Sequence, residues 1–154
     1  MNTTLNGYIP PQETSTEEII LGAILIEKGA MAKIADLLEP ADFYKEDYRL
    51  IYEAAYTLHK QQKPIDIITV VTELKRVSKL DIVGGSYSVS KLTNKVASSS
   101  NIEHHAAIVK QMSMLRQIIY NAQEAIRESY TNGANPFEIQ SSLIKKLQNL
   151  IPIV

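Results

Sequence analysis

Cysteine is absent from all 154 residues of the chain. A disulfide framework and a thiolate metal site are therefore excluded, and a reducing compartment fits this composition. An excess of one charge is also missing, because 16 Lys and Arg stand against 17 Asp and Glu, for a net charge of -1. Without a positive field, the chain by itself is expected to hold DNA only weakly or not at all.

Long apolar runs and a signal segment are missing as well. No run approaches the ~18 residues that span a bilayer, and the N-terminal "MNTTLNGYIPPQETS" lacks the positive start and apolar core of a signal peptide. The chain has instead 45% hydrophobic and 21% charged residues, a usual balance for a globular domain. We expect a cytoplasmic protein with no membrane segment.

The spacing of apolar residues is helical almost throughout, which predicts an all-α fold. We expect a flexible N-terminal arm over 1–14 and a globular helical body over 15–98. Residues 65–79 are rich in β-branched side chains and would also fit a strand, but capping by Asp66 favours a helix. The predicted body helices cover about 15–27, 31–38, 42–62, 65–79 and 86–97.

The second half of the sequence predicts a projecting antiparallel helical hairpin over 101–150. One long helix runs without Pro or Gly until Gly133, and a short loop leads into a second helix. Burying roughly 600 Å² of its apolar surface on association would contribute on the order of 15 kcal/mol before association costs. The residues predicted to pack the hairpin and contact another subunit are Ile108, Met112, Leu115, Ile119, Ile126, Leu143 and Leu147.

Four residues are predicted to cap helices: Ser15, Asp66, Ser100 and Asn135. Asp66 lies among isoleucines and valines, where an acid or base of an active site is the alternative interpretation. No second carboxylate, His or Lys is arranged around it, and it directly precedes an apolar helical face. We therefore expect its carboxylate to accept a hydrogen bond from a backbone N–H near Ile68 or Thr69.

No catalytic, cofactor-binding or metal-binding residue is predicted. None of the six glycines precedes a Lys, so a phosphate-binding loop is absent. His104 and His105 point about 100° apart on a helix and cannot share a metal as an i, i+4 pair can. Carboxylate pairs such as Glu17 with Glu18 are interpreted as polar-face or first-turn residues. A small all-α nucleotide hydrolase, which needs inward carboxylates, is the weaker alternative.

Seven short segments, in order, resemble the N-terminal domain of replicative hexameric DNA helicases of the DnaB type. They are "IPPQ" at 9–12 with Glu17, "LGAIL" at 21–25, "DFY" at 42–44, "LIYEA" at 50–54, "PIDIIT" at 64–69, "GG" at 84–85, and "NIEHHAAIV" with Leu115 and Arg116 at 101–116. Together they cover about 9–130. The chain departs from the family's pattern at Tyr48 and Ser88.

The resemblance implies a non-catalytic domain whose hairpin pairs subunits of a hexameric ring. It further implies docking of a DnaG-type primase and, in some systems, of a helicase loader. ATP and Mg²⁺ would belong to a C-terminal RecA-like ATPase domain, which is absent from this chain. A freestanding helical dimerisation or adaptor protein without a helicase partner is the alternative, and downstream genomic sequence would discriminate the two.

Overall fold

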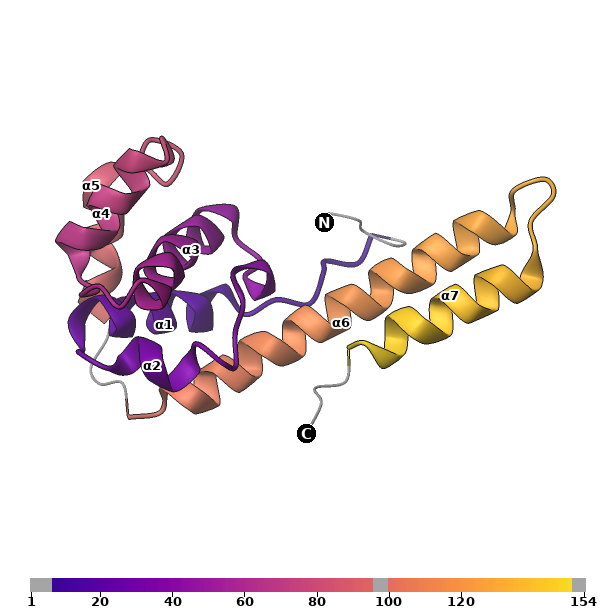
Figure 1. Ribbon diagram of the computed structural model, residues 1–154, viewed down its shortest axis with the longest axis horizontal. Helices are drawn as coiled ribbons and strands as arrows, with labels where there is room; N and C mark the ends of the chain where they lie inside the picture. The colour runs from indigo at the N-terminus through magenta and orange to yellow at the C-terminus, as the bar shows by residue number, and fades with distance from the viewer. Residues whose placement is uncertain (1–6, 96–99, 151–154) are drawn as a thin grey trace. The chain divides into compact units, whose positions relative to one another are not determined.

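The computed structural model describes residues 7–95 and 100–150, and within these ranges it is helical without any strand (Figure 1). The predicted all-α class is confirmed. Over the same residues no helix is long and apolar enough to cross a membrane. The elements are α1 (Thr14–Ile26), α2 (Ala30–Ile34), η1 (Pro40–Asp42), α3 (Glu46–Lys60), α4 (Ile67–Arg76), α5 (Gly85–Lys91), η2 (Leu92–Lys95), α6 (Ile102–Ser129) and α7 (Pro136–Gln148).

The chain divides into two compact units. The body unit is Gln12–Met112, and the hairpin unit comprises residues 7–11 with 113–150. The predicted limits of 15–98 and 101–150 place all of α6 in the hairpin, whereas the contacts place Ile102–Met112 in the body unit. Residues 1–6 of the predicted arm and 96–98 of the predicted body lie outside the described residues.

The core of the body unit is built around α1. Its residues Ile20, Leu21 and Ile24 are almost fully buried, and the helix packs against α2, α3 and η2. A helix that is apolar on nearly every side is stable only when other elements surround it. The sequence "IILGAILI" therefore makes α1 the central helix of the body.

Tyr52 of α3 is the largest fully buried side chain of this core. Its ring stacks on Phe43 with a centroid separation of 4.5 Å, and its hydroxyl donates to the carbonyl of Leu38 over 3.0 Å. Burial raises the pKa of the Tyr52 hydroxyl, so it stays a neutral hydrogen-bond donor. Tyr48 and Tyr56, four residues before and after Tyr52 on the same helix, are partly buried and also pack against the core.

Two buried carboxylates fix the segment that precedes α3. Glu17 is 1% exposed and accepts hydrogen bonds from the backbone N–H groups of Tyr44 (2.6 Å) and Lys45 (3.3 Å). Asp42 is 3% exposed, and the ammonium of Lys110 on α6 lies 3.0 Å from its Oδ2. Glu17 lies in the first turn of α1, as predicted, but it is buried and not on a polar face, because a backbone segment 27 residues further along the chain packs against it.

One predicted cap, Ser15, differs from the structure. Helix α1 begins at Thr14 with Glu13 in the N-cap position and no side-chain cap, so Ser15 lies inside the first turn and is not the cap. At α6 the carbonyl of Asn101 accepts the backbone hydrogen bond from His105 (3.0 Å), and Ser100 lies one residue before Asn101. The capping role of Ser100 stays a prediction.

Two other caps are confirmed. Asp66 is the N-cap of α4, and its Oδ1 accepts from the backbone N–H of Thr69 over 2.8 Å. The hydroxyl of Thr69 in turn accepts from the backbone N–H of Asp66 over 2.9 Å, which completes a reciprocal capping box. Asn135 caps α7 by accepting from the backbone N–H groups of Phe137 and Glu138.

Candidate interface on the helical hairpin

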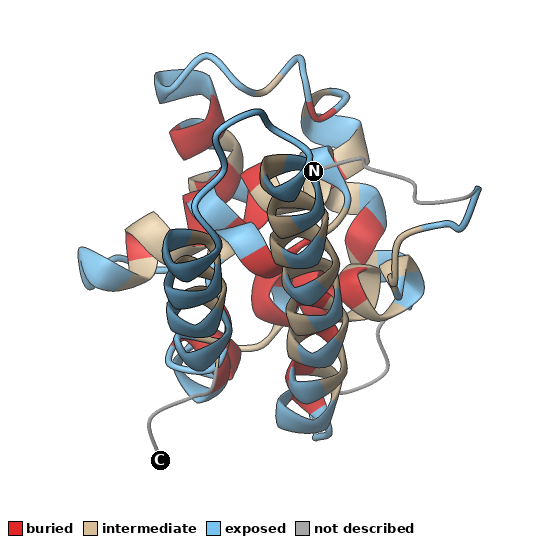
Figure 2. Ribbon diagram, turned by 90° about the vertical axis from the view of Figure 1, so that its right-hand side faces the viewer, coloured by how far each residue is buried: buried red, intermediate tan, exposed pale blue. Residues whose placement is uncertain are grey.

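Helices α6 and α7 lie side by side and antiparallel (Figures 1 and 2). The turn between them contains Gly133 with a φ of +79°, a left-handed conformation that suits glycine. Asn135 and Pro136 then start α7, the first as N-cap and the second in the first turn. Local sequence signals therefore account for the reversal of the chain.

Glu124 joins the two helices. Its Oε2 accepts from the ammonium of Lys146 on α7 over 3.0 Å, and its Oε1 accepts from the hydroxyl of Tyr120 over 3.0 Å and from Arg127 over 3.2 Å. The hydrogen bond from Lys146, more than that from Tyr120, lowers the pKa of the Glu124 carboxyl. The side of α6 that carries Glu124 is therefore the side that faces α7.

An apolar stripe runs along the opposite side of α6. It consists of four exposed residues, Leu115, Ile118, Ala122 and Ile126. Leu115 is 44% exposed, Ile118 43% and Ile126 52%. At about 100° per residue these four lie within about 80° of one another around the helix axis. Glu124 follows Leu115 by nine residues, or two and a half turns, so these two side chains lie on opposite sides of α6. Because Glu124 faces α7, the stripe points away from α7. We call these four residues the outer stripe.

The second helix and the turn expose further apolar side chains. No described residue of α7 is buried, and Figure 2 shows both helices mostly as intermediate or exposed. Tyr130 and Phe137, on either side of the turn, are 88% and 76% exposed, and Ile144 is 48% exposed. Intramolecular packing in the hairpin unit therefore leaves uncovered apolar surface on α6, on α7 and at the turn.

The seven residues predicted for the hairpin have different environments. Leu115, Ile126 and Leu147 are exposed, Leu147 the least at 37%. Four are half-buried: Ile108, Met112, Ile119 and Leu143. Their role in subunit contact stays a proposal.

Two outer-stripe residues, Ile118 and Ala122, were missing from the prediction, and Ile118 is the larger of them. Apolar residues on one face of a helix recur every three or four positions. Ile118 and Ile119 are adjacent and both apolar, so this spacing accommodates either one. In the folded hairpin Ile118 is exposed and Ile119 is half-buried, a difference that depends on the position of α7. Side-chain size and hydropathy carry no signal that would separate the two.

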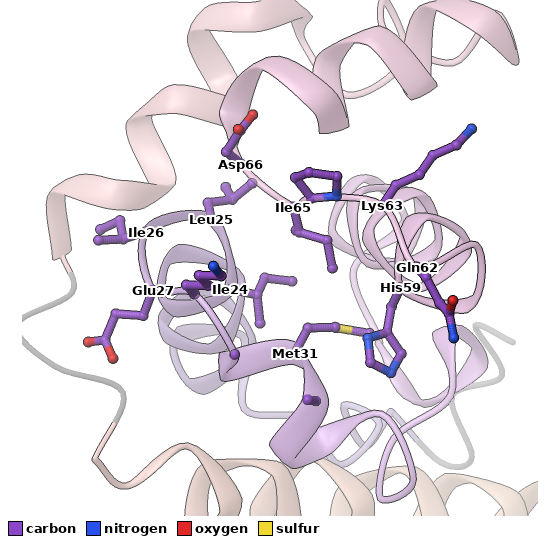
Figure 3. Close-up of a pocket in the computed structure, with 14 residues that line it drawn as sticks. Ile24, Leu25, Ile26, Glu27, Met31, His59, Gln62, Lys63, Ile65 and Asp66 are labelled. Atoms are coloured by element: carbon purple, nitrogen blue, oxygen red, sulfur yellow. The ribbon is translucent and has the colours of Figure 1, made fainter.

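A hollow of about 630 Å³ lies in the body unit (Figure 3). Ile24, Met31 and Ile65 are among its apolar lining residues, with His59 beside Met31. Asp66 stands at its wall, but its carboxylate serves as the α4 cap. Its contact with Thr69 agrees with the interpretation of Asp66 as a cap.

No three His, Asp or Glu side chains within residues 7–95 and 100–150 come together as metal ligands do. Glu17 accepts from backbone N–H groups, Glu73 pairs with Arg76, and Glu124 pairs with Lys146 and Arg127 and accepts from Tyr120. These contacts stabilise helices and their packing. The exposed apolar surface of the hairpin unit is thus the candidate site.

Comparison with known proteins gives a family match over most of the body. Residues 9–111 match the family model described as the DnaB-like helicase N terminal domain. The chain is 35% identical over 150 residues to the replicative DNA helicase DnaC of Bacillus subtilis (strain 168), covering 97% of this chain and 33% of that protein. It is 35% identical over 133 residues to the replicative DNA helicase DnaB of Rhodothermus marinus, covering 86% of this chain and 14% of that protein. The chain thus spans a third or less of these relatives.

Solved structures show the same fold. The crystal structure of the N-terminal domain of DnaB helicase from Mycobacterium tuberculosis has a TM-score of 0.84 and 28% identity, and the match covers 91% of this chain and 99% of that one. A structure of a DnaB-like replicative helicase, described together with its interactions with primase, has a TM-score of 0.78 and 23% identity, covering 91% of this chain and 32% of that one.

Proposed function

The chain belongs to the DnaB-like helicase N-terminal domain family, and from this premise we propose that it is a non-catalytic assembly domain that pairs subunits of a replicative helicase through its hairpin. The observation that carries the proposal is the outer stripe of α6. Leu115, Ile118 and Ile126 remain 43–52% exposed although α7 packs against the same helix.

The physical basis is the cost of hydrating an apolar stripe. Exposed apolar patches of this kind mark protein–protein interfaces in soluble proteins. Glu124 and Lys146 hold α6 and α7 together on the inner side, so the outer stripe is presented on a fixed scaffold. A preorganised helical face loses little conformational freedom on association, which favours binding.

Recruitment of a primase is the second part of the proposal. It is supported by the family resemblance and by the fold shared with the helicase whose structure is described with its primase interactions. Docking of a helicase loader is proposed on the resemblance alone. ATP hydrolysis with Mg²⁺ and DNA translocation are assigned to the portion of the relatives that this chain does not cover.

Sedimentation tests the pairing. We expect concentration-dependent association of the wild-type chain, and at least about tenfold weaker association for Ile118→Asp, because a charge would be buried against an apolar partner. Ile68→Asp is the matched control, since Ile68 is an isoleucine of α4 that is 76% exposed and lies outside the hairpin. A wild-type chain that stays monomeric at several hundred micromolar would contradict the proposal.

Primase recruitment is tested separately by titrating the C-terminal domain of the primase from the same organism into the wild-type chain. Saturable binding by calorimetry is the expected result. Absence of binding by both the monomeric and the associated forms would refute recruitment and leave only the assembly role. The Ile118→Asp variant, which should be monomeric, shows whether the primase needs the paired form.

A further inference from the structure

Tyr8 and Ile9 form an exposed apolar pair on the segment that precedes α1. Each of the two residues is 75% exposed. Within residues 7–95 and 100–150 no other two sequence neighbours are both large, apolar and exposed. Residues 7–12, which read "GYIPPQ", carry no charge. The pair is therefore a short apolar ligand that the chain presents to its surroundings.

The backbone next to this pair is restrained. Pro10 and Pro11 follow directly, and each pyrrolidine ring fixes its own φ near about −65°. The carbonyl of Pro11 accepts a hydrogen bond from the guanidinium of Arg116 over 2.8 Å. Because this backbone is already anchored, inserting Tyr8 and Ile9 into another surface costs little further conformational entropy.

The hollow of the body unit has the chemistry that a tyrosine side chain requires. Ile24, Met31 and Ile65 supply apolar walls, and Figure 3 shows the imidazole of His59 beside the Met31 side chain. A methionine sulfur packs favourably against an aromatic ring, and an imidazole nitrogen exchanges a hydrogen bond with a hydroxyl. The hollow therefore suits a side chain with an apolar ring and a polar tip.

The charges around the hollow balance. Lys28 and Lys63 stand against Glu27 and Asp66 in its lining. Figure 3 shows Glu27 and Lys63 pointing away from the centre, and the carboxylate of Asp66 is engaged as the α4 cap. An uncharged segment can therefore enter without burying an unpaired charge, whereas a strongly charged peptide gains no counter-charge there.

We propose that this hollow binds Tyr8 of a second copy of the chain, with Ile9 covering its edge. The tyrosine ring packs on Met31, and its hydroxyl hydrogen-bonds to His59. The contact is heterologous, because the segment of one copy meets the hollow of the other. It is separate from the hairpin pairing of the proposed function and does not use the outer stripe.

The other strongly exposed tyrosines lack an apolar neighbour. Tyr87 is 76% exposed and lies between two serines, and Tyr130 is 88% exposed and lies between a serine and a threonine. Neither brings a second large apolar side chain to the edge of the hollow. Tyr8, with Ile9 beside it, therefore matches the hollow best. At 75% exposure Tyr8 does not fill the hollow of its own chain.

The exposed area sets the strength of the contact. Tyr8 and Ile9 together present roughly 250 Å². This is far below the roughly 800 Å² per partner of standard specific interfaces, so the contact is weak between free copies. Once another contact holds two copies together, the effective concentration of the segment reaches the millimolar range. The contact therefore adds to an assembly and does not create one alone.

A peptide titration tests the hollow directly. The probe is a synthetic peptide GYIPPQ with blocked ends, and the receiver is the Tyr8→Ser chain, whose own segment cannot compete. With ¹³C-labelled methionine methyl groups, the ring current of the bound tyrosine should shift the Met31 resonance saturably and leave Met112 unchanged. A control peptide with serine in place of tyrosine should bind at least about tenfold more weakly. No Met31 shift at millimolar peptide, or equal binding of both peptides, would overturn the inference.

Cross-linking tests whether the occupant comes from a second copy. The chain has no cysteine, and Ala32 is an exposed residue of the hollow's lining. After mild oxidation, Ile9→Cys mixed with Ala32→Cys should give more cross-linked dimer than Ile9→Cys mixed with Thr72→Cys, which is exposed on α4 outside the hollow. Equal yields would overturn the inference. A chain that carries both Ile9→Cys and Ala32→Cys and closes on itself at high dilution would show that the segment fills its own hollow, which also overturns it.

Two variants separate this inference from the proposed function. Ile118→Asp should leave the Met31 shift unchanged, because the hollow does not involve α6. Ala32→Arg should weaken peptide binding at least about tenfold by obstructing the hollow, with the circular dichroism spectrum of the folded chain retained. Unchanged binding by Ala32→Arg would overturn the inference. A chain that associates through its hairpin but never binds the peptide would refute the inference alone, and peptide binding by a chain that stays monomeric would refute only the pairing.

Discussion

Replacing Glu17 by Gln tests whether this carboxylate organises the body unit. Glu17 is 1% exposed, and its two oxygens accept the backbone N–H groups of Tyr44 and Lys45 at the entry to α3. A glutamine of the same shape has one acceptor oxygen and one amide donor. The oxygen can keep the hydrogen bond from the N–H of Tyr44. The NH₂ group then faces the N–H of Lys45, and because both groups are donors, that hydrogen bond is lost.

The magnitude follows from the bonds that change. Hydrogen bonds to a charged group contribute about 1.5–3 kcal/mol, and a buried donor left without an acceptor costs about 1–3 kcal/mol. The variant weakens one bond and loses another, so we expect the free energy of unfolding to fall by about 2–3 kcal/mol. With a urea slope of about 2 kcal/mol per molar, the denaturation midpoint should fall by about 1 M or slightly more.

Urea denaturation followed by circular dichroism at low micromolar protein is the assay, because dilution limits stabilisation by association. Glu18→Gln is the matched control. Glu18 forms a salt bridge of 3.0 Å with Lys95, whose side chain is 63% exposed, so its loss should cost less than about 1 kcal/mol. Equal midpoints for the two variants would refute the assignment of Glu17 as a buried acceptor.

Two further predictions concern Asp66 and Glu124. Asp66→Ala should lower the free energy of unfolding by about 0.5–2 kcal/mol, while Asp66→Asn, which preserves the acceptor, should change it little. Equal losses in thermal unfolding of the two variants would refute the capping role. Because Lys146 lowers the pKa of Glu124, the stability from this pair is present above the carboxyl's unfolded pKa and is lost as pH falls through the folded pKa. Lys146→Met should therefore destabilise the chain at about pH 7 but not at about pH 2; a pH-independent difference would contradict this.

Much of the fold follows from local signals that the sequence displays. Pro, Gly and capping residues mark the helix boundaries, and the capping box of Asp66 with Thr69 forms inside a single turn. Asn135 and Pro136 likewise specify the start of α7 without help from distant residues. Interactions between residues two to four apart depend on helix geometry alone, which is why periodicity predicts them.

The role of Glu17 depends on a contact that no local pattern contains. Glu17 has the sequence context of a first-turn carboxylate, yet it is buried because the segment at Tyr44 returns to α1. Ser15 has the composition of a cap, but the backbone of Glu13 already accepts the first hydrogen bonds of the helix. Long-range packing therefore decides the environment of Glu17, whereas Ser15 is excluded as a cap by the residue at which the first helical hydrogen bonds form.

The sequence by itself determined that the chain is helical, that it ends in a hairpin, and that α6 carries an apolar seam, because these properties arise from spacing along one helix. Only the tertiary structure decided which side of that seam is covered. Glu124 reaches Lys146 and turns one side of α6 toward α7, which leaves Leu115, Ile118, Ala122 and Ile126 exposed. The direction of a helical face is fixed by what packs against its opposite side, and that contact joins residues 22 positions apart in the chain.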